Sequence, residues 1–307
     1  MPCFHPLDAY RSRERNPVTG KYGITFKSSD ALIENLGSAM RLPCGKCIGC
    51  RVDRSRSWAV RCMHEAQMHL ENCFLTLTYD EKNLPDDYSV NVREWQLFMK
   101  RLRESVPQKL RFFACGEYGS EEGQHPLQPH YHALIFNYRP TDLKLHSKKN
   151  NIPLYTSEKL SKLWPYGFST VGNVTYKTAA YCARYTMKKI GGDQAADHYS
   201  RVHPVTGRLV QVKPEFATQS RAEGLGGKWL EEFKADYFPS DFIVVDGKKH
   251  PVPDFYTRRL NESEALKLKR ARKRDAHKRK EDNTHKRLLI REQVKIAQIS
   301  TLKRKLS

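Results

Sequence analysis

The chain has 307 residues and a formal charge of +20, from 54 Lys and Arg residues against 34 Asp and Glu residues. This length is enough for one full domain with appended segments, and the charge favours a polyanionic partner, most often nucleic acid, over a membrane surface. No window approaches about eighteen consecutive apolar residues, which excludes a membrane-spanning helix. The N-terminus lacks the apolar core of a secretory signal. We therefore expect a reducing cytoplasm, where the eight cysteines would be free thiols or metal ligands.

Residues 1–50 are expected to be irregular, apart from a short hairpin around the turn at Asn16–Gly20. They contain three cysteines in a C-x-x-C-x-x-C spacing, namely Cys44, Cys47 and Cys50. Three thiolates this close, with glycines between them, can surround a tetrahedral Zn²⁺, with Cys3 or His5 as the fourth ligand. Because the segment has little apolar material, a metal would supply order that burial cannot. Unligated thiols and an iron–sulfur cluster are the alternatives.

The hydrophobic patterns that follow predict a mixture of helices and strands. Helical spacing predicts helices over residues 52–71, 89–103, 158–164 and 178–189, and alternation predicts strands over residues 73–79, 110–119, 129–136 and 166–175. The lysine-rich stretch 142–151 is expected to be a solvated connection. Hairpin-connected strands mixed with packed helices favour an α+β fold, in which helices pack on an antiparallel sheet.

The predicted strand 129–136 carries the pattern His-Tyr-His. Side chains alternate between the two faces of a strand, so His130 and His132 lie on the same face and could hold one metal ion. The preceding strand ends near Glu117, and a connection of about ten residues with Gly and Pro suits a hairpin that would bring this carboxylate beside the imidazoles. Two imidazoles and one carboxylate form a nitrogen–oxygen site that suits Mn²⁺ or Mg²⁺. His125 is a rival ligand.

The predicted helix 178–189 carries two tyrosines, Tyr181 and Tyr185, which are four residues apart and therefore share a face. Such a pair commonly packs in a core. Beside a two-histidine metal site in a basic chain, it is a candidate pair of nucleophiles. Lys188 could steady phosphate charge or assist proton transfer. Two further basic residues of the helix are candidate DNA contacts, Arg184 and Lys189.

The C-terminal part of the chain carries no catalytic motif. Residues 193–257 are expected to contain a hairpin over 199–212, a helix over 228–237 and a strand over 242–245. The last fifty residues hold 18 Lys and Arg against 6 Asp and Glu, which is +12 of the total charge. This composition predicts a long basic helix that contacts DNA or a partner, or a solvated helix that aids solubility. Its candidate DNA-binding residues are Arg270, Arg272, Lys273 and Arg274.

Three of these motifs together resemble the HUH endonucleases, which nick single-stranded DNA. His130-Tyr131-His132 resembles their His-hydrophobe-His signature. The spacing Tyr181-x-x-x-Tyr185-x-x-Lys188 resembles the two-tyrosine motif of rolling-circle initiators, and residues 74–79 resemble the first strand motif. Over roughly residues 1–190, including the chain start and the cysteine run, the sequence is most similar to the replication initiation proteins of gokushovirus-type microviruses, which are small single-stranded DNA bacteriophages.

The resemblance implies both a fold and a reaction. It implies histidines on a central strand of an antiparallel sheet, with the tyrosine helix lying over it. Tyr181 or Tyr185 would nick single-stranded DNA at an origin, keep a 5′-phosphotyrosine and free a 3′ hydroxyl that primes a host polymerase, and the ends would later be rejoined. The metal would be held by His130, His132 and Glu117. A host helicase would unwind the strands, since the chain shows no helicase-type phosphate loop, and the reaction would take place in the cytoplasm of the bacterial host.

We therefore predict four parts: a Cys-rich segment that is a candidate zinc site (1–50), an HUH-like nicking domain (51–192), an extension of uncertain fold (193–257) and a basic tail (258–307). Three alternatives remain. The first is a non-catalytic basic protein that stacks single-stranded bases on its sheet. The second is an HUH plasmid initiator, relaxase or transposase. The third is a zinc-finger regulator built on the cysteine run.

Overall fold

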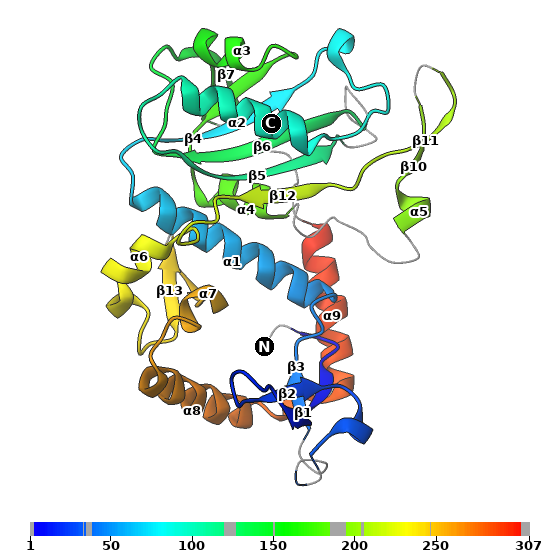
Figure 1. Cartoon of the computed structure of the whole chain (residues 1–307), viewed down its shortest axis with the longest axis vertical. Helices are drawn as coiled ribbons and strands as arrows, with labels where there is room; N and C mark the ends of the chain where they lie inside the picture. The colour runs from blue at the N-terminus through cyan, green and yellow to red at the C-terminus, as the bar shows by residue number, and fades with distance from the viewer. Residues whose placement is uncertain are drawn as a thin grey trace. The chain divides into compact units, whose positions relative to one another are not determined.

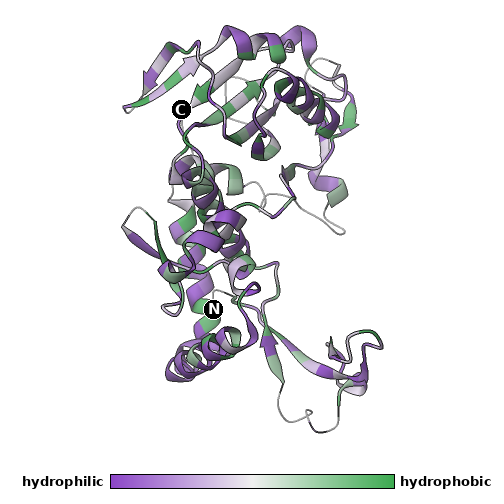
Figure 2. Ribbon diagram, turned by 60° about the vertical axis from the view of Figure 1, so that its left-hand side comes forward, coloured by the Kyte–Doolittle hydropathy of each residue, from purple (hydrophilic) through white to green (hydrophobic). Residues whose placement is uncertain are grey.

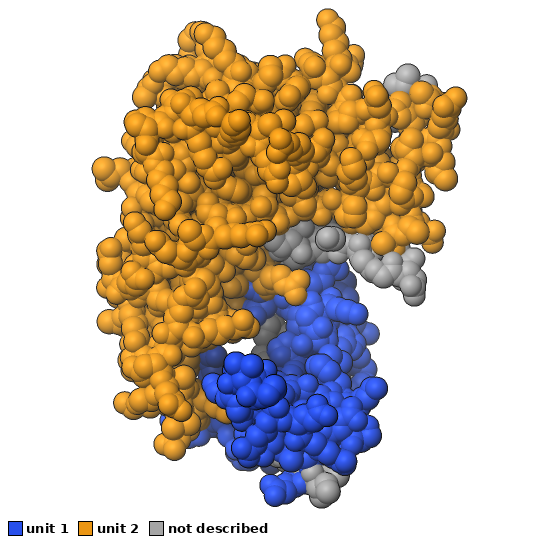
Figure 3. Space-filling model, viewed as in Figure 1, with its two compact units in different colours: residues 1–53, 271–304 blue, residues 54–270, 305–307 orange. Residues whose placement is uncertain are grey.

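The structure is a computed structural model that describes residues 3–32, 34, 39–119, 127–149, 151–184, 195–203, 206–245 and 247–301. The chain divides into two compact units, unit 1 (residues 1–53 and 271–304) and unit 2 (residues 54–270 and 305–307), which Figure 3 colours separately. No helix in the described ranges combines the length and the apolar composition that a bilayer crossing requires.

A seven-stranded antiparallel sheet organises unit 2 (Figure 1), in the order β12–β5–β6–β4–β9–β8–β7. Its strands are β4 (Asn72–Thr78), β5 (Arg111–Tyr118), β6 (Pro129–Phe136), β7 (Lys144–Lys149), β8 (Ile152–Thr156), β9 (Ser169–Gly172) and β12 (Phe216–Gln219). Helices pack on this sheet, so the predicted α+β fold with an antiparallel sheet is confirmed. The strand β12 comes from the segment 193–257, for which the sequence predicted no part in the sheet.

Helices cover both faces of the sheet, and the alternation of side chains decides which residues meet them. Leu75 and Leu77 point to the face on which α2 (Val92–Glu104) and α3 (Glu158–Leu163) pack, and they share a core with Trp95. The opposite face carries Phe74 and packs against α1 (Ile48–Gln67) and α4 (Tyr176–Arg184). The strands are correspondingly rich in apolar residues (Figure 2). The second face is the one that carries the histidines.

The lysine-rich stretch 142–151 was expected to be a plain connection, and this expectation was wrong. Residues 144–149 form β7, which pairs with β8 at the edge of the sheet. The alternation rule missed this strand because β7 is exposed on both faces, with even Leu145 62% exposed. Lysines on an edge strand also discourage pairing with other chains, so a polar sequence is expected there.

Residues 1–50 are likewise more regular than predicted. They form a three-stranded sheet in the order β2–β1–β3, from β1 (Leu7–Arg15), β2 (Tyr22–Thr25) and β3 (Met40–Leu42). The hairpin predicted around Asn16–Gly20 is confirmed, because β1 and β2 pair on either side of it. The strands themselves were missed because they are mostly exposed and show little apolar alternation.

The described remainder consists of short elements and two long helices: α5 (Ala195–His198), β10 (Ser200–Val202), β11 (Leu209–Gln211), α6 (Gly227–Glu232), β13 (Phe242–Val245), β14 (Lys248–Pro251), α7 (Asp254–Thr257), α8 (Glu262–Lys278) and α9 (His285–Ser300). The hairpin predicted over 199–212 and the strand over 242–245 are present. The tail forms two helices rather than one long one. The side chain of Asn283 bonds to the carbonyl of Arg279 there, and such local bonds compete with the helix.

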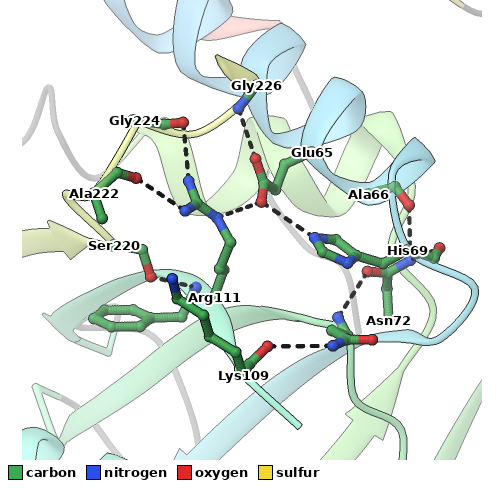
Figure 4. Close-up of polar contacts among 12 residues, drawn as sticks. Glu65, Ala66, His69, Asn72, Lys109, Arg111, Ser220, Ala222, Gly224 and Gly226 are labelled. Atoms are coloured by element: carbon green, nitrogen blue, oxygen red, sulfur yellow. Dashed lines mark hydrogen bonds and ion pairs between the residues drawn. The ribbon is translucent and has the colours of Figure 1, made fainter. Parts of the chain in front are cut away.

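A buried ion pair anchors the strand β5 to the helix α1 (Figure 4). Arg111 Nε lies 2.5 Å from Glu65 Oε1, and the Gly226 amide donates to Glu65 Oε2 at 2.7 Å. Arg111 Nη1 donates to the Ala222 carbonyl and Nη2 donates to the Gly224 carbonyl, each at 2.9 Å. Burial would raise the pKa of Glu65, but its hydrogen bonds and the Arg111 charge hold this pKa below the ordinary value. The network fixes β5 against α1 and against the loop that follows β12.

The buried side chain of His64 should make the folded chain less stable in acid. Its ring is 2% exposed, stacks on Trp229 at 3.5 Å, and has Nδ1 2.8 Å from Tyr256 Oη. Burial lowers the pKa of His64 to about 3. An unfolded histidine titrates near 6.5, so below that pH the unfolded chain binds a proton that the folded chain does not. The free energy of unfolding should therefore fall by about 1.4 kcal/mol per pH unit from 6.5 toward 3.

Urea unfolding followed by tryptophan fluorescence at pH 7 and pH 5 measures this effect. His64→Phe keeps a ring on Trp229 but cannot titrate, so its stability should change less between the two pH values than that of the wild type. The matched control is His285→Gln, which alters an exposed histidine. An equal pH dependence in His64→Phe and wild type would contradict the assignment.

Candidate active site

The pairing of β5 with β6 decides which residues face one another. The strands are antiparallel, with Glu117 directly opposite His130 and Cys115 directly opposite His132. Because side chains alternate along each strand, Glu117, His130 and His132 all point to the same face. The structure thus brings together the three residues for which the sequence predicted a shared site.

The three side chains converge on a point between the two strands. Glu117 Oε1 lies 3.2 Å from His130 Nε2 and 3.0 Å from His132 Nε2. The three ligand atoms all lie within 4.8 Å of one another, close enough to hold one metal ion. Glu117 is 1% exposed, whereas His130 is half-buried, so the site is open on the side of His130. This arrangement could bind a divalent cation.

Each imidazole is oriented by a bond on its other ring nitrogen. His130 Nδ1 donates to the carbonyl of Gln128 at 3.0 Å, and this oxygen can only accept. A neutral His130 therefore presents its lone pair on Nε2. His132 Nδ1 lies 3.0 Å from Thr76 Oγ1, on the residue directly opposite it in β4. Such outer contacts are typical of histidines that ligate metals, because they fix ring orientation and tautomer.

The sequence did not predict the roles of Thr76 and Gln128. The Thr76 contact depends on the register between β4 and β6, which a single sequence does not specify. The Gln128 contact is local, because it joins a ring nitrogen to the backbone carbonyl two residues earlier. Thr76 lies in the segment 74–79 that resembles the first strand motif, and this was the one available signal. The residue opposite a histidine on the neighbouring strand can be identified only once the pairing is known.

The carboxyl group of Glu117 is strongly acidic. Burial alone would raise its pKa, but hydrogen bonds and charge interactions with His130 and His132 outweigh burial and lower the pKa to about 2 when their Nε2 atoms carry protons, which a bound metal ion would replace. The group is therefore a carboxylate at neutral pH. A charged oxygen held between two imidazole nitrogens is a suitable partner for a cation.

Helix α4 lies against the sheet (Figure 1), and Tyr181 packs against the core on the face that carries the histidines. The helix begins with a reciprocal cap, in which the Thr178 amide donates to Thr175 Oγ1 at 3.2 Å and the Thr175 amide donates to Thr178 Oγ1 at 2.8 Å. Small residues then let the helix approach the strands closely. Ala179, Cys182 and Ala183 are fully buried in the core between α4 and the sheet.

Tyr181 lies beside the histidines. The centroid of its half-buried ring is 4.9 Å from that of His132, and the two rings are nearly perpendicular. The Tyr181 ring is also perpendicular to that of Phe74, at 6.5 Å between centroids. The guanidinium carbon of Arg184 lies 5.1 Å from the Tyr181 ring centroid, which adds a positive charge to this side of the site. The other predicted residues of this region lie outside the described residues, namely His125, Tyr185, Lys188 and Lys189.

The cysteine run forms a second potential metal-binding group, in unit 1. The run and Cys3 together place four sulfurs within 4.8 Å of one another, those of Cys3, Cys44, Cys47 and Cys50. The fourth member is thus Cys3. The other fourth ligand that the sequence suggested, His5, instead has Nε2 2.6 Å from the Glu292 carboxylate. Burial would raise the pKa of Cys47, but amide bonds from Phe4 and Cys50 and bonds with neighbouring thiols lower it to about 7.

The predicted DNA-binding residues of the tail lie on α8, and their side chains are exposed: Arg270, Arg272, Lys273 and Arg274. Among the described residues of α8 and α9, only Leu268 and Leu288 are buried. The helices are therefore mostly solvated, and their contact with DNA stays a prediction.

Comparison with known proteins places these residues in a family. A family model described as "Replication-associated protein ORF2/G2P" matches residues 72–190, which include Glu117, His130, His132 and Tyr181. The replication-associated protein VP4 of Bdellovibrio phage phiMH2K is 35% identical over 268 residues, which cover 83% of this chain and 76% of the relative.

Two further relatives agree with this match. The replication-associated protein ORF2 of Spiroplasma virus 4 is 28% identical, covering 85% of this chain and 80% of the relative. The replication-associated protein ORF4 of Chlamydia phage 1 is 30% identical, covering 70% of this chain and 52% of the relative. No solved structure matches the chain significantly. The chain belongs to the family of replication-associated proteins of gokushovirus-like microviruses.

Proposed function

We propose that this chain initiates rolling-circle replication by nicking single-stranded DNA with a tyrosine beside a divalent metal ion. The observation that carries the proposal is the convergence of Glu117, His130 and His132 at one point, with the Tyr181 ring packed against His132. The names of the relatives support a role in replication. The chemistry is inferred from the site.

The donor set fits Mg²⁺ or Mn²⁺. Two imidazole nitrogens and one carboxylate oxygen leave coordination positions for water and for phosphate oxygens. An ion bound there would polarise the scissile phosphate and neutralise charge that develops on its oxygens. Thr76 and the Gln128 carbonyl would keep the two imidazoles in the orientation that ligation needs.

The tyrosine performs the bond exchange in this proposal. The Tyr181 hydroxyl oxygen would form a bond to phosphorus while the bond from phosphorus to the 3′ oxygen breaks. The phenol loses its proton to solvent or a base, and the departing oxygen takes up a proton to become a 3′ hydroxyl. An ordinary tyrosine with a pKa of about 10 is only about 0.1% phenolate at pH 7. Nearby positive charge, which Arg184 contributes, would favour the phenolate.

The covalent product accounts for the rest of the cycle. The 5′-phosphotyrosine keeps the energy of the broken bond, so the ends can be rejoined without ATP. Tyr185 would supply the second cleavage after one round, and Lys188 would steady phosphate charge or assist proton transfer. The free 3′ hydroxyl would prime a host polymerase, while a host helicase separates the strands in the bacterial cytoplasm.

Further DNA contacts would come from basic side chains outside the metal site, namely Arg184, Lys189, Arg270, Arg272, Lys273 and Arg274. Phosphate neutralisation releases counterions, so this part of the affinity should fall steeply with salt. A variant without the metal-site histidines should lose covalent attachment but keep salt-sensitive binding. That result would separate the contribution of the metal site from that of the basic side chains.

The direct test uses a library of single-stranded oligonucleotides with a randomised central segment. With Mn²⁺, a label at the 3′ end should become attached to the protein in a form that survives SDS, whereas a 5′ label should not. EDTA should prevent attachment. Transfer of the 5′ label would contradict the proposed polarity. Binding without any covalent attachment would favour a non-catalytic single-stranded DNA-binding protein.

Removing the hydroxyl of Thr76 tests the orientation of His132. Thr76→Val has nearly the same shape but leaves His132 Nδ1 without its bond. Loss of such an outer contact typically weakens metal binding about 10–100-fold. Titration of Mn²⁺ by calorimetry gives the dissociation constant. The matched control is Thr78→Val on the same strand, whose hydroxyl instead donates to the Phe168 carbonyl. Equal affinities in the two variants would show that Thr76 does not position His132.

A further inference from the structure

We propose that the four cysteines of unit 1, Cys3, Cys44, Cys47 and Cys50, bind one structural Zn²⁺ ion through four thiolates. This site is separate from the nicking chemistry, since none of its residues belongs to the group around Glu117. Its role is to hold the N-terminal sheet together.

The spacing of the sulfurs matches a single tetrahedral ion. With zinc–sulfur bonds of about 2.3 Å, tetrahedral geometry places the sulfurs about 3.8 Å apart. The sulfurs of Cys3 and Cys47 are 4.0 Å apart, and all four lie within 4.8 Å of one another. An iron–sulfur cube has four metal ions between its ligands, so it would hold its cysteines farther apart. The geometry therefore favours zinc among the alternatives that the sequence left open.

Three of the four sulfurs accept a hydrogen bond from a backbone amide. The Cys44 amide donates to Cys3 Sγ at 3.3 Å, and the Cys47 amide donates to Cys44 Sγ at 3.3 Å. The Phe4 amide donates to Cys47 Sγ at 3.4 Å. Sulfur is a weak acceptor as a thiol, whereas hydrogen bonds to a charged group are stronger. Gly45 adopts φ of 72° in this turn, which glycine allows without strain.

The position of the cluster explains what an ion would stabilise. Strand β1 begins four residues after Cys3, and β3 ends two residues before Cys44. These strands pair with Leu7 opposite Leu42, so Cys3 and Cys44 both lie just beyond the same end of the strand pair. Cys50 lies in the first turn of α1, and Cys47 directly precedes that helix. One ion would therefore join two strands and a helix.

Unit 1 has little else to hold it. Among its described residues, the buried apolar side chains are few: Cys3, Phe4, Ala9, Ala31, Cys50 and Leu288. Two of these are members of the cluster itself. Segments with so small a core are usually stabilised by metals or disulfides, and all eight cysteines are free thiols. Binding of Zn²⁺ would release the thiol protons to solvent, and the binding energy would contribute directly to folding of the segment.

Metal analysis of the purified full chain tests the proposal. We expect about one equivalent of zinc after gel filtration in metal-free buffer. The variant Cys44→Ser with Cys47→Ser should lose this zinc. Cys73→Ala, which alters a buried cysteine in the sheet, should keep it. His130→Ala with His132→Ala should also keep it, so the result does not depend on the proposed nicking function. Zinc that stays bound in the double serine variant, or iron in its place, would overturn the proposal.

Cobalt substitution of the wild-type chain provides a test that does not require a variant to fold. Replacing zinc with Co²⁺ should give the intense visible and near-ultraviolet bands of a tetrahedral site with four sulfur ligands. Bands of an octahedral oxygen and nitrogen site alone would contradict it.

Removing the ion with a chelator should make the segment 3–42 more sensitive to trypsin, and unchanged cleavage there would show that no metal holds the sheet.

Discussion

Replacing Tyr181 and Tyr185 together by phenylalanine is expected to abolish the covalent adduct between the protein and single-stranded DNA. Each change removes only a hydroxyl, so the Tyr181 ring should keep its contacts with His132 and Arg184. Loss of a nucleophile in other covalent enzymes lowers the rate on the order of 10⁶-fold. The 3′-labelled oligonucleotide assay should therefore fall to the background of a reaction without protein.

The single variants separate the roles of the two tyrosines. Tyr181→Phe should lower the first cleavage if Tyr181 attacks first, whereas Tyr185→Phe should then affect only the later transfer. The matched control is Tyr176→Phe, on the same helix, whose hydroxyl lies 3.4 Å from His250 Nδ1 and not at the metal-binding group. That variant should form the adduct at the wild-type rate. A full yield of adduct from the double variant would rule out both residues as nucleophiles.

Removing the imidazoles should eliminate the dependence on divalent metal and the activity together. We expect His130→Ala to lower adduct formation in Mn²⁺ by about a hundredfold to a thousandfold, the range seen when a group that stabilises developing charge is removed. His130 is the better residue to replace in this test, because it is partly exposed and its loss should disturb the core less. His132 also packs against Phe74 and Tyr181, so its loss could move the tyrosine.

Three measurements make this result specific. Circular dichroism should show an unchanged fold in His130→Ala. Binding of single-stranded DNA should keep its salt dependence, because the basic side chains are intact. His146→Ala, which removes an exposed histidine on β7, is the control for loss of an imidazole and should cleave normally. Cleavage by His130→Ala at the wild-type rate and with the same Mn²⁺ requirement would show that the ion is held elsewhere.

The sequence was sufficient to predict that Glu117, His130 and His132 lie together. The two-residue period of a strand places His130 and His132 on one face, and the short Gly- and Pro-containing link brings Glu117 to the adjacent strand. These arguments need only local spacing. The position of Tyr181 over that face required the resemblance, because the packing of a helix on a sheet depends on small residues whose partners lie far away in the sequence.

Other features could not be obtained from one sequence. The contact of Thr76 with His132 depends on the register of β4 against β6, which is set by many cross-strand pairs at once. The choice of Cys3 over His5 depends on the pairing of β1 with β3, strands that are too exposed to show an apolar pattern. The edge strand β7 was missed for the same reason.

Mapping the amino acid that carries the DNA tests the central claim most directly. After incubation with single-stranded DNA and Mn²⁺, the DNA is trimmed with nuclease and the protein is digested with trypsin. Cleavage after Lys177 and Arg184 puts Tyr181 and Tyr185 in different peptides. The account predicts a nucleotide phosphate on the tyrosine of one of these two peptides, absent when Mn²⁺ is withheld. A nucleotide on any other peptide, or cleaved DNA without a covalent peptide, would contradict it.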